Sequence, residues 1–127
     1  MDINKLSSKI IGVAIEVHKS LGPGLLESAY EECICYEFGL RHLSFERQKP
    51  LQVVYKGKNL NCGYRLDIVV ENVIILELKS CDKIEAIHRA QVLTYLKLSG
   101  LSLGLILNFN TPVMKDGIVR IVNEFKG

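Results

Sequence analysis

Three charged side chains interrupt an otherwise apolar part of the chain, and their spacing suggests chemistry. Asp67 precedes the apolar run 68–70, and Glu77 and Lys79 lie at the end of the next apolar run. A carboxylate or an ammonium group that leaves water has to be paired, hydrogen-bonded or bound to a metal ion. An Asp, a Glu and a Lys held together can bind a divalent cation beside a phosphate. These residues therefore suggest phosphodiester chemistry.

The geometry of a β-strand decides whether these three groups can meet. Side chains alternate between the two faces of a strand, so Glu77 and Lys79 project together. A three-residue connection at 71–73, or a bulge, pairs Asp67 with Glu77. A two-residue loop would instead place Asp67 opposite Leu76, on the wrong face. The length of this connection is therefore a structural test.

The surrounding elements are predicted in the order α-α-β-β-β-α-β-β. Apolar residues at helical spacing predict a first helix over 3–21. The run Gly22-Pro23-Gly24 separates it from a second helix, which extends from Leu25 to about Phe38 with Gly39 as a left-handed stop. Strands are expected over 51–55, 60–70, 73–79 and 101–109, and a third helix over 84–98 that ends at Gly100. The segment 118–125 is compatible with a strand or a helical turn, and its alternation favours the strand.

Composition limits the class of protein. The 127 residues fit one domain, 1–127, of the α/β (α+β) class, and the formal charge of +2 does not mark a nucleic-acid binder, although a local basic face stays open. Cys33, Cys35, Cys62 and Cys81 lack the Cys-x-x-Cys pairs of zinc sites and are expected to be free thiols. We expect a cytoplasmic protein without a membrane segment, because the sequence has no signal-peptide pattern and no apolar run of roughly 20 residues.

Two motifs resemble those of a known family. Asp67 and Glu77-Leu78-Lys79 resemble the motif of the PD-(D/E)xK nuclease superfamily, with an Asp on one strand and Glu-x-Lys on the next; Leu66 stands where the literal motif has proline. The run from Gly24 to Tyr30, Gly-Leu-Leu-Glu-Ser-Ala-Tyr, resembles the signature of the GxxExxY family within that superfamily. The resemblance covers nearly the whole chain and implies a restriction-endonuclease-like core, with a central mixed sheet flanked by helices.

The resemblance implies a metal site. Mg²⁺ is usually held by one or two carboxylates together with waters and substrate phosphate, so Asp67 and Glu77 are the expected ligands, with the Leu78 carbonyl as a third and Mn²⁺ as an alternative ion. Lys79 is expected to position the attacking water and to stabilise charge on the phosphate. A salt-bridged surface patch is the alternative. The resemblance implies that Glu27 is a further acidic ligand, although a carboxylate in the first turn also simply favours the helix dipole.

Accessory residues are expected on the second and third helices. Tyr30 either hydrogen-bonds near Glu27 or fills the core, and the core is favoured. Gln91 and Tyr95 share one stripe of the third helix, and this spacing is similar to an accessory motif in the exonuclease branch of the superfamily, which implies a catalytic role for Gln91 and a supporting one for Tyr95. No histidine metal site is expected. Basic residues that either contact phosphates or only solvate the surface are Arg47, Lys49, Lys56, Lys58, Lys83, Arg89 and Lys97.

The sequence thus predicts a magnesium-dependent nuclease that acts on nucleic acid, expected to be DNA. The alternative is a catalytically inactive nuclease fold that binds nucleic acid or a protein partner. A chain this small has little surface with which to hold a long duplex, so a homodimer or a larger complex would make functional sense.

Overall fold

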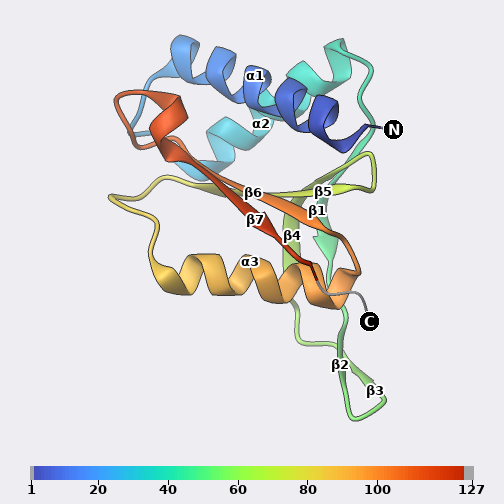
Figure 1. Ribbon diagram of the computed structural model, residues 1–127. Helices are drawn as coiled ribbons and strands as arrows, with labels where there is room; N and C mark the ends of the chain where they lie inside the picture. The colour runs from blue at the N-terminus through green and yellow to red at the C-terminus, as the bar shows by residue number, and fades with distance from the viewer. Residues whose placement is uncertain (1, 125–127) are drawn as a thin grey trace.

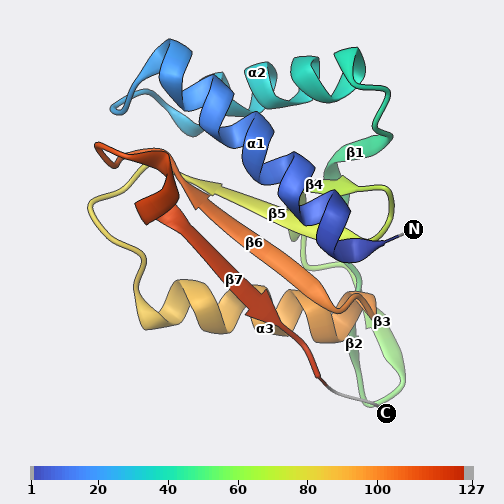
Figure 2. The ribbon, with the colours of Figure 1, turned by 45° about the horizontal axis from the view of Figure 1, so that its top comes forward.

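A mixed β-sheet lies between two helical layers in the computed structural model, which describes residues 2–124 (Figure 1). Helices α1 (Ile3–Leu21) and α2 (Glu27–Leu40) cover one face of the sheet, and α3 (Ala86–Ser99) covers the other. Figure 2 shows the same three layers with α1 in front of the sheet. The predicted fold class, a central mixed sheet flanked by helices, is confirmed.

The main sheet has five strands in the order β1-β4-β5-β6-β7. Strands β5 (Ile74–Lys79) and β6 (Leu103–Asn108) are parallel, and all other neighbours are antiparallel. Helix α3 makes the crossover between β5 and β6 that a parallel pair requires. These two central strands are almost wholly buried, as their continuous apolar sequence predicts. The final strand, β7 (Ile118–Val122), confirms the predicted strand for residues 118–122, whereas Phe125 lies outside the described residues.

Each face of the sheet contributes to its own hydrophobic cluster. Ile68, Leu76 and Leu105 pack against the layer of α1 and α2. Ile75 and Ile106 pack against α3. Because alternate residues of one strand enter different clusters, the central strands are apolar on both faces, and a charged residue at their ends is conspicuous.

Helices α2 and α3 begin at Glu27 and Ala86, each two residues later than expected, and one predicted helix end is also wrong. Helix α1 is capped by Asp2, whose side chain accepts hydrogen bonds from two backbone N–H groups, and α3 ends at Gly100 in the left-handed conformation (φ 76°). The predicted stop at Gly39 is wrong, because α2 continues to Leu40. The chain then turns so that Leu43 enters the core, where its N–H donates to the carbonyl of Phe38 at 2.9 Å.

The segment between α2 and β5 forms more strands than the sequence pattern indicated. The expected pair 51–55 and 60–70 is replaced by β1 (Phe45–Pro50) and β4 (Arg65–Val70) in the main sheet and by a separate small hairpin, β2 (Val53–Tyr55) with β3 (Lys58–Leu60). The polar residues of β1 hide its strand character, and the long expected strand is interrupted at 61–64, which includes a left-handed Gly63. We call residues 51–64 the hairpin arm; Figure 1 shows it projecting below α3.

Within residues 2–124, no helix combines the length and the apolar character that a membrane crossing would need.

Candidate active site

The connection between β4 and β5 has three residues, 71–73, and this sets the register of the two acidic groups. Glu71 and Asn72 adopt positive φ angles of 52° and 54°, which tighten the turn. The ladder pairs Val70 with Ile74 and continues to Ile68 and Leu76. The next pair in this register is Asp67 and Glu77, as the parity of the strands requires for a shared site.

The sheet is irregular at Asp67. Strand β1 pairs with residues on both sides of Asp67, yet Gln48 opposite it is unpaired and has a φ of 49°. Leu66 belongs to the cluster on the α3 face and Ile68 to the cluster on the other face, although simple alternation would put both on one face. The strand therefore changes face at Asp67 in the manner of a β-bulge, a feature that commonly redirects a side chain next to a functional site.

In place of the missing ladder hydrogen bonds, the Asp67 and Glu77 side chains each accept a hydrogen bond from the backbone of the other residue's strand. Asp67 Oδ2 accepts a hydrogen bond from the Leu78 N–H at 2.8 Å, and the Asp67 N–H donates to Glu77 Oε1 at 3.3 Å. The two carboxyl groups also share a side-chain hydrogen bond. Each carboxyl is thus fixed by the backbone of the neighbouring strand and in contact with the other.

Burial and mutual repulsion make both groups weak acids. Burial is the main cause that raises the pKa of Glu77 to about 8, and the negative charge of Asp67 adds to it. Burial also raises the pKa of Asp67, while the Leu78 hydrogen bond opposes that change. The positive charge of Lys79 acts in the opposite direction and lowers the pKa of both carboxyls. Such a pair retains a proton near neutral pH, and a divalent cation can take the place of that proton.

A cavity of about 220 Å³ opens beside Asp67. Helix α2 forms one wall of it, because Glu27 is the first residue of the helix and Glu31 follows one turn later. The structure therefore places Glu27 in the same cavity as Asp67, whereas Glu77 lies behind them and is only 7% exposed. The lining residues are Glu27, Ser28, Glu31, Gln48, Asp67 and Leu78.

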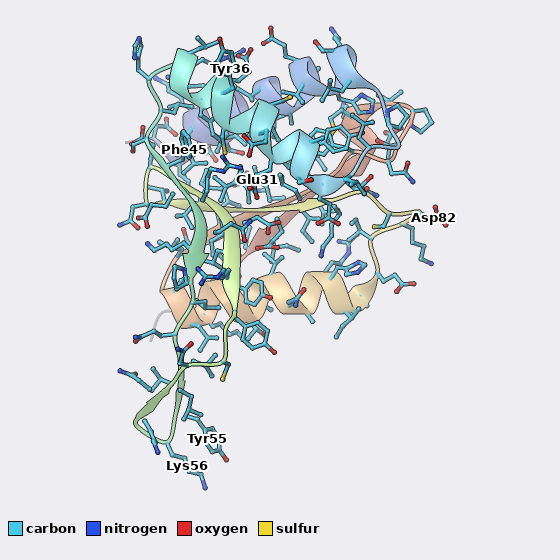
Figure 3. All side chains as sticks on the ribbon, turned by 180° about the vertical axis from the view of Figure 1, so that it is seen from behind. Glu31, Tyr36, Phe45, Tyr55, Lys56 and Asp82 are labelled. Atoms are coloured by element: carbon cyan, nitrogen blue, oxygen red, sulfur yellow. The ribbon has the colours of Figure 1, made fainter. Side chains whose placement is uncertain are left out.

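Glu31 is a member of the site that the sequence pattern did not indicate. Its side chain is largely buried, and it accepts hydrogen bonds from Arg47 Nη2 at 2.9 Å and from Gln48 Nε2 at 2.8 Å. Figure 3 shows Glu31 on the side of α2 that faces the sheet. Its charge also raises the pKa of Asp67. The signal that could have found it is the spacing of four residues from Glu27, which puts both acids on one helical stripe.

Tyr30 fixes the loop that leads into α2. Its ring is fully buried and stacks on Phe109 with the centroids 4.2 Å apart. Its hydroxyl donates to the Gly22 carbonyl at 2.6 Å and accepts from the Leu25 N–H at 3.1 Å. Ser80 Oγ donates to the Leu25 carbonyl at 2.7 Å, which ties the same loop to the chain just after Lys79. Tyr30 is thus a core residue that also holds the start of α2 against the end of β5.

The two residues expected on α3 are placed differently. Gln91 is exposed and lies in a separate groove, away from the acidic cavity. Tyr95 lines that groove too, but it is buried, and burial first, and then the charge of Glu77, raise the pKa of Tyr95. The structure thus brings Tyr95 close to the carboxyl pair, whereas Gln91 lies exposed at the edge of the groove beside α3.

The donor set suits a magnesium ion that keeps waters and a phosphate among its ligands. Within residues 2–124, no group of three or more His, Cys, Asp or Glu side chains is arranged to hold a metal ion by itself. Asp67 and Glu77 nevertheless form a carboxyl pair in direct contact. Mg²⁺ is commonly bound by one or two carboxylates, with the remaining positions filled by water and substrate.

Comparison with known proteins identifies the family. The model of the PD-(D/E)XK nuclease superfamily matches residues 4–121, from α1 into β7. Neither the curated proteins nor the solved structures give a match. Nucleases of this superfamily generally use divalent metal ions and act on nucleic acids. The matched region includes the carboxyl pair, Lys79 and the start of α2, and the chain belongs to the PD-(D/E)XK nuclease superfamily.

Proposed function

We propose that this protein is a nuclease of the GxxExxY family that hydrolyses phosphodiester bonds of DNA with Mg²⁺. The observation that carries the proposal is the pair of hydrogen bonds that tie the Asp67 and Glu77 side chains to each other's strand, with Lys79 projecting from the same face of β5 as Glu77. Superfamily membership supports nuclease activity. The Gly24 to Tyr30 signature supports the narrower family, because Tyr30 holds the loop that positions Glu27.

In this proposal each residue has a separate duty. Asp67 and Glu77 would hold the ion, together with the Leu78 carbonyl, and Glu27 would add a carboxylate from the cavity wall, directly or through water. The ion supplies charge stabilisation at the phosphate and an activated water. Lys79 orients that water and offsets the negative charge that grows on the phosphate oxygens. Gln91, on the rim of the neighbouring groove, contacts substrate, and Tyr95 supports Glu77 from the α3 side.

The test is cleavage of plasmid and oligonucleotide DNA in the presence of Mg²⁺ or Mn²⁺. Lys79→Ala and Asp67→Asn, made separately, should each lower the rate by about 100-fold or more, the size of effect seen when one group that stabilises transition-state charge is removed. Lys9→Ala is the matched control, since Lys9 is an exposed lysine on α1, and it should cut as the wild type does.

Metal binding separates this proposal from its alternative. Isothermal titration with Mg²⁺ should show binding to the wild type and weak or no binding to Asp67→Asn. A wild type that neither cuts any DNA nor binds Mg²⁺ or Mn²⁺ would refute the enzyme and leave an inactive nuclease fold that serves as a binding module.

A further inference from the structure

The hairpin arm and α3 enclose an open groove of about 420 Å³ on the α3 side of the sheet. Its walls are mostly apolar, and two of its residues are tyrosines whose ring centroids lie 6.4 Å apart at an angle of 56°. Ile87 is 69% exposed and Tyr64 is 49% exposed. Large apolar side chains that are this exposed beside a groove indicate a binding surface for a ligand or partner. The groove is lined by Leu51, Val53, Tyr64, Ile87, Gln91 and Tyr95, with three smaller contributors from α3.

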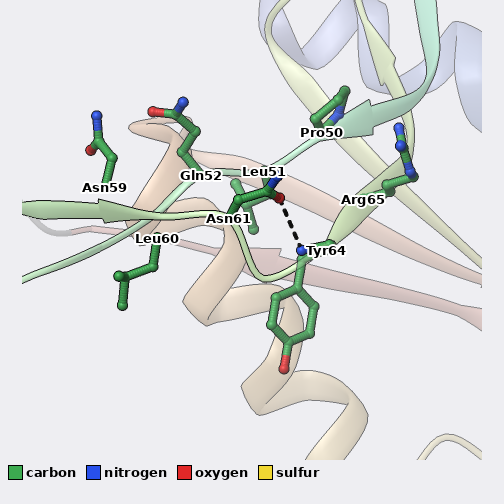
Figure 4. Close-up of a pocket in the computed structure, with 9 residues that line it drawn as sticks. Pro50, Leu51, Gln52, Asn59, Leu60, Asn61, Tyr64 and Arg65 are labelled. Atoms are coloured by element: carbon green, nitrogen blue, oxygen red, sulfur yellow. Dashed lines mark hydrogen bonds between the residues drawn. The ribbon is translucent and has the colours of Figure 1, made fainter.

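A second, more polar cavity lies at the base of the arm, on the other side of Tyr64 from α3 (Figure 4). This cavity measures about 250 Å³ and shares Leu51 and Tyr64 with the groove. The Leu51 N–H donates to the Tyr64 carbonyl at 2.9 Å, so the two strands that leave the sheet are joined at this point. Figure 4 shows Tyr64 between the cavity and α3, with Arg65 beside it. An occupant could therefore touch aromatic rings on one side and amide or guanidinium groups on the other.

The arm and the strand residues at its base carry a local positive charge. Residues 47–66 contain five basic residues and no acidic residue, in a chain whose formal net charge is only +2. Arg47 and Lys49 are paired with glutamates, whereas the ion pairs found within residues 2–124 do not involve Lys56, Lys58 or Arg65. Figure 3 shows Lys56 at the tip of the arm, away from the body of the protein. Neither of the two cavities has an acidic lining residue. This surface is complementary to a polyanion that runs along the arm.

The aromatic groove decides which polyanion fits. A duplex presents phosphates and base edges, and its base faces are covered by stacking. An unpaired strand exposes base faces, which stack on tyrosine rings without regard to sequence, and a positively charged groove follows its backbone. Tyr95 also connects the groove to the site, because it packs in the same cluster as Ile75, and Glu77 projects from the same face of β5 as Ile75. A strand held in the groove would thus lie on the Glu77 side of the carboxyl pair.

We propose that the groove between the hairpin arm and α3 binds an unpaired DNA strand, whose bases stack on the exposed ring of Tyr64, which the buried ring of Tyr95 contacts from the core, and whose phosphates contact Lys56, Lys58 and Arg65. This inference rests on the proposed function and extends it, because it makes single-stranded DNA the substrate that the active site receives. The arm then provides a DNA-binding surface that the small core lacks.

The test measures binding without cutting. A fluorescently labelled single strand, a duplex of the same sequence and an RNA strand are titrated in EDTA and followed by fluorescence anisotropy. The single DNA strand should bind about 10-fold more tightly than the duplex, and Tyr64→Ala should remove about 10-fold of that affinity, within the range for the loss of one stacked base. Tyr64→Phe keeps the ring and should bind as the wild type does. The matched control is Tyr36→Ala, because Tyr36 is an exposed tyrosine on α2, and it should change nothing.

Two further measurements separate stacking from charge. A strand with abasic sites should bind weakly, and Tyr64→Ala should not weaken it further, since the base that stacks is already absent. The double variant Lys56→Gln/Lys58→Gln should reduce the slope of log affinity against log salt by about 1.4, because each phosphate contact on a single strand contributes about 0.7. The pair Lys5→Gln/Lys9→Gln, on exposed positions of α1, should leave the slope unchanged.

The inference is wrong if the duplex binds as tightly as the single strand, or if Tyr64→Ala behaves like Tyr36→Ala while both variants melt like the wild type. An RNA strand that binds more tightly than DNA would overturn the assignment to DNA. These outcomes are independent of the nuclease proposal: a protein that cuts plasmid duplex and shows no strand preference keeps the nuclease and loses this groove. A protein that binds single strands by Tyr64 and never cuts keeps the groove and loses the nuclease.

Discussion

Replacing Glu77 with glutamine should change how the stability of the protein depends on pH. In the folded protein burial and the charge of Asp67 raise the pKa of Glu77 from 4.5 to about 8. The folded protein therefore holds this proton more tightly than the unfolded chain does. The resulting contribution to stability is complete below pH 4.5 and is lost as the pH rises to about 8. Glutamine has nearly the same shape and no proton to lose, so the variant should lack this part of the pH dependence.

The size of the effect follows from the two pKa values. Each pKa unit corresponds to about 1.36 kcal/mol, so the wild type loses roughly 2 to 3 kcal/mol between pH 5.5 and pH 7.5 through this carboxyl. For a domain of this length, 1 kcal/mol shifts the melting temperature by about 4 °C. The melting temperature of the wild type should therefore fall by about 10 °C more than that of Glu77→Gln over this interval.

The assay is thermal unfolding followed by circular dichroism in EDTA, at half-unit steps from pH 5 to pH 8.5. Glu46→Gln is the control, because Glu46 is an exposed carboxylate on β1, and its curve should run parallel to that of the wild type. Adding Mg²⁺ at pH 8 should raise the melting temperature of the wild type and leave Glu77→Gln unchanged, because the ion takes the place of the proton. Parallel curves for the wild type and Glu77→Gln in EDTA would refute the argument, since they would show that Glu77 titrates alike in the folded and unfolded states.

Two predictions concern the supports of the site. Tyr30→Phe keeps the ring on Phe109 and removes the hydroxyl that bonds Gly22 and Leu25, so urea unfolding should show a loss of about 1 to 2 kcal/mol; an unchanged midpoint would mean that water replaces both bonds. A methyl group at Gly117 would overlap the backbone carbonyl of Asn108, so Gly117→Ala should cost about 3 kcal/mol. The matched substitution Gly12→Ala, at a helical position with free space, should instead stabilise the protein by about 0.8 kcal/mol; equal melting temperatures for the two alanine variants would contradict this.

The parts of the fold that the sequence predicts are those set by local periodicity. Helix α1, with its apolar stripe and its glycine end, is found at the predicted residues, and the central strands follow from their apolar runs. The region 45–64 is different. Strand β1 has a polar sequence and becomes a strand only because β4 offers it hydrogen-bond partners, which no local pattern records. Gly39 shows the same limit in a helix, since the position of Leu43 in the core outweighs a residue that often ends helices.

The residues of the candidate site also divide into those that the sequence predicts and those that it does not. Asp67, Glu77 and Lys79 could be selected from the sequence because a charge at the end of a buried strand requires a reason, and strand parity gives the rule for their meeting. Glu31 could not be selected so easily. Its place depends on Arg47 and Gln48, which come from a strand that the sequence pattern does not predict. A residue whose environment is made by another, unpredicted element stays hidden until the tertiary structure is known.

The irregularity at Asp67 accounts for the position of the whole site. A regular ladder through Gln48, Asp67 and Glu77 would use the backbone N–H groups that now bind the two carboxyls. Because the ladder breaks there, Asp67 reaches the cavity under α2, Gln48 turns its amide to Glu31, and Leu66 enters the other face of the sheet. The chain then leaves the sheet on the α3 side as the hairpin arm. The same interruption of the ladder therefore frees the backbone N–H groups that bind the acidic pair. It also directs the basic arm to the face where Tyr95 adjoins that pair. The metal site and the proposed DNA groove thus have a common structural origin.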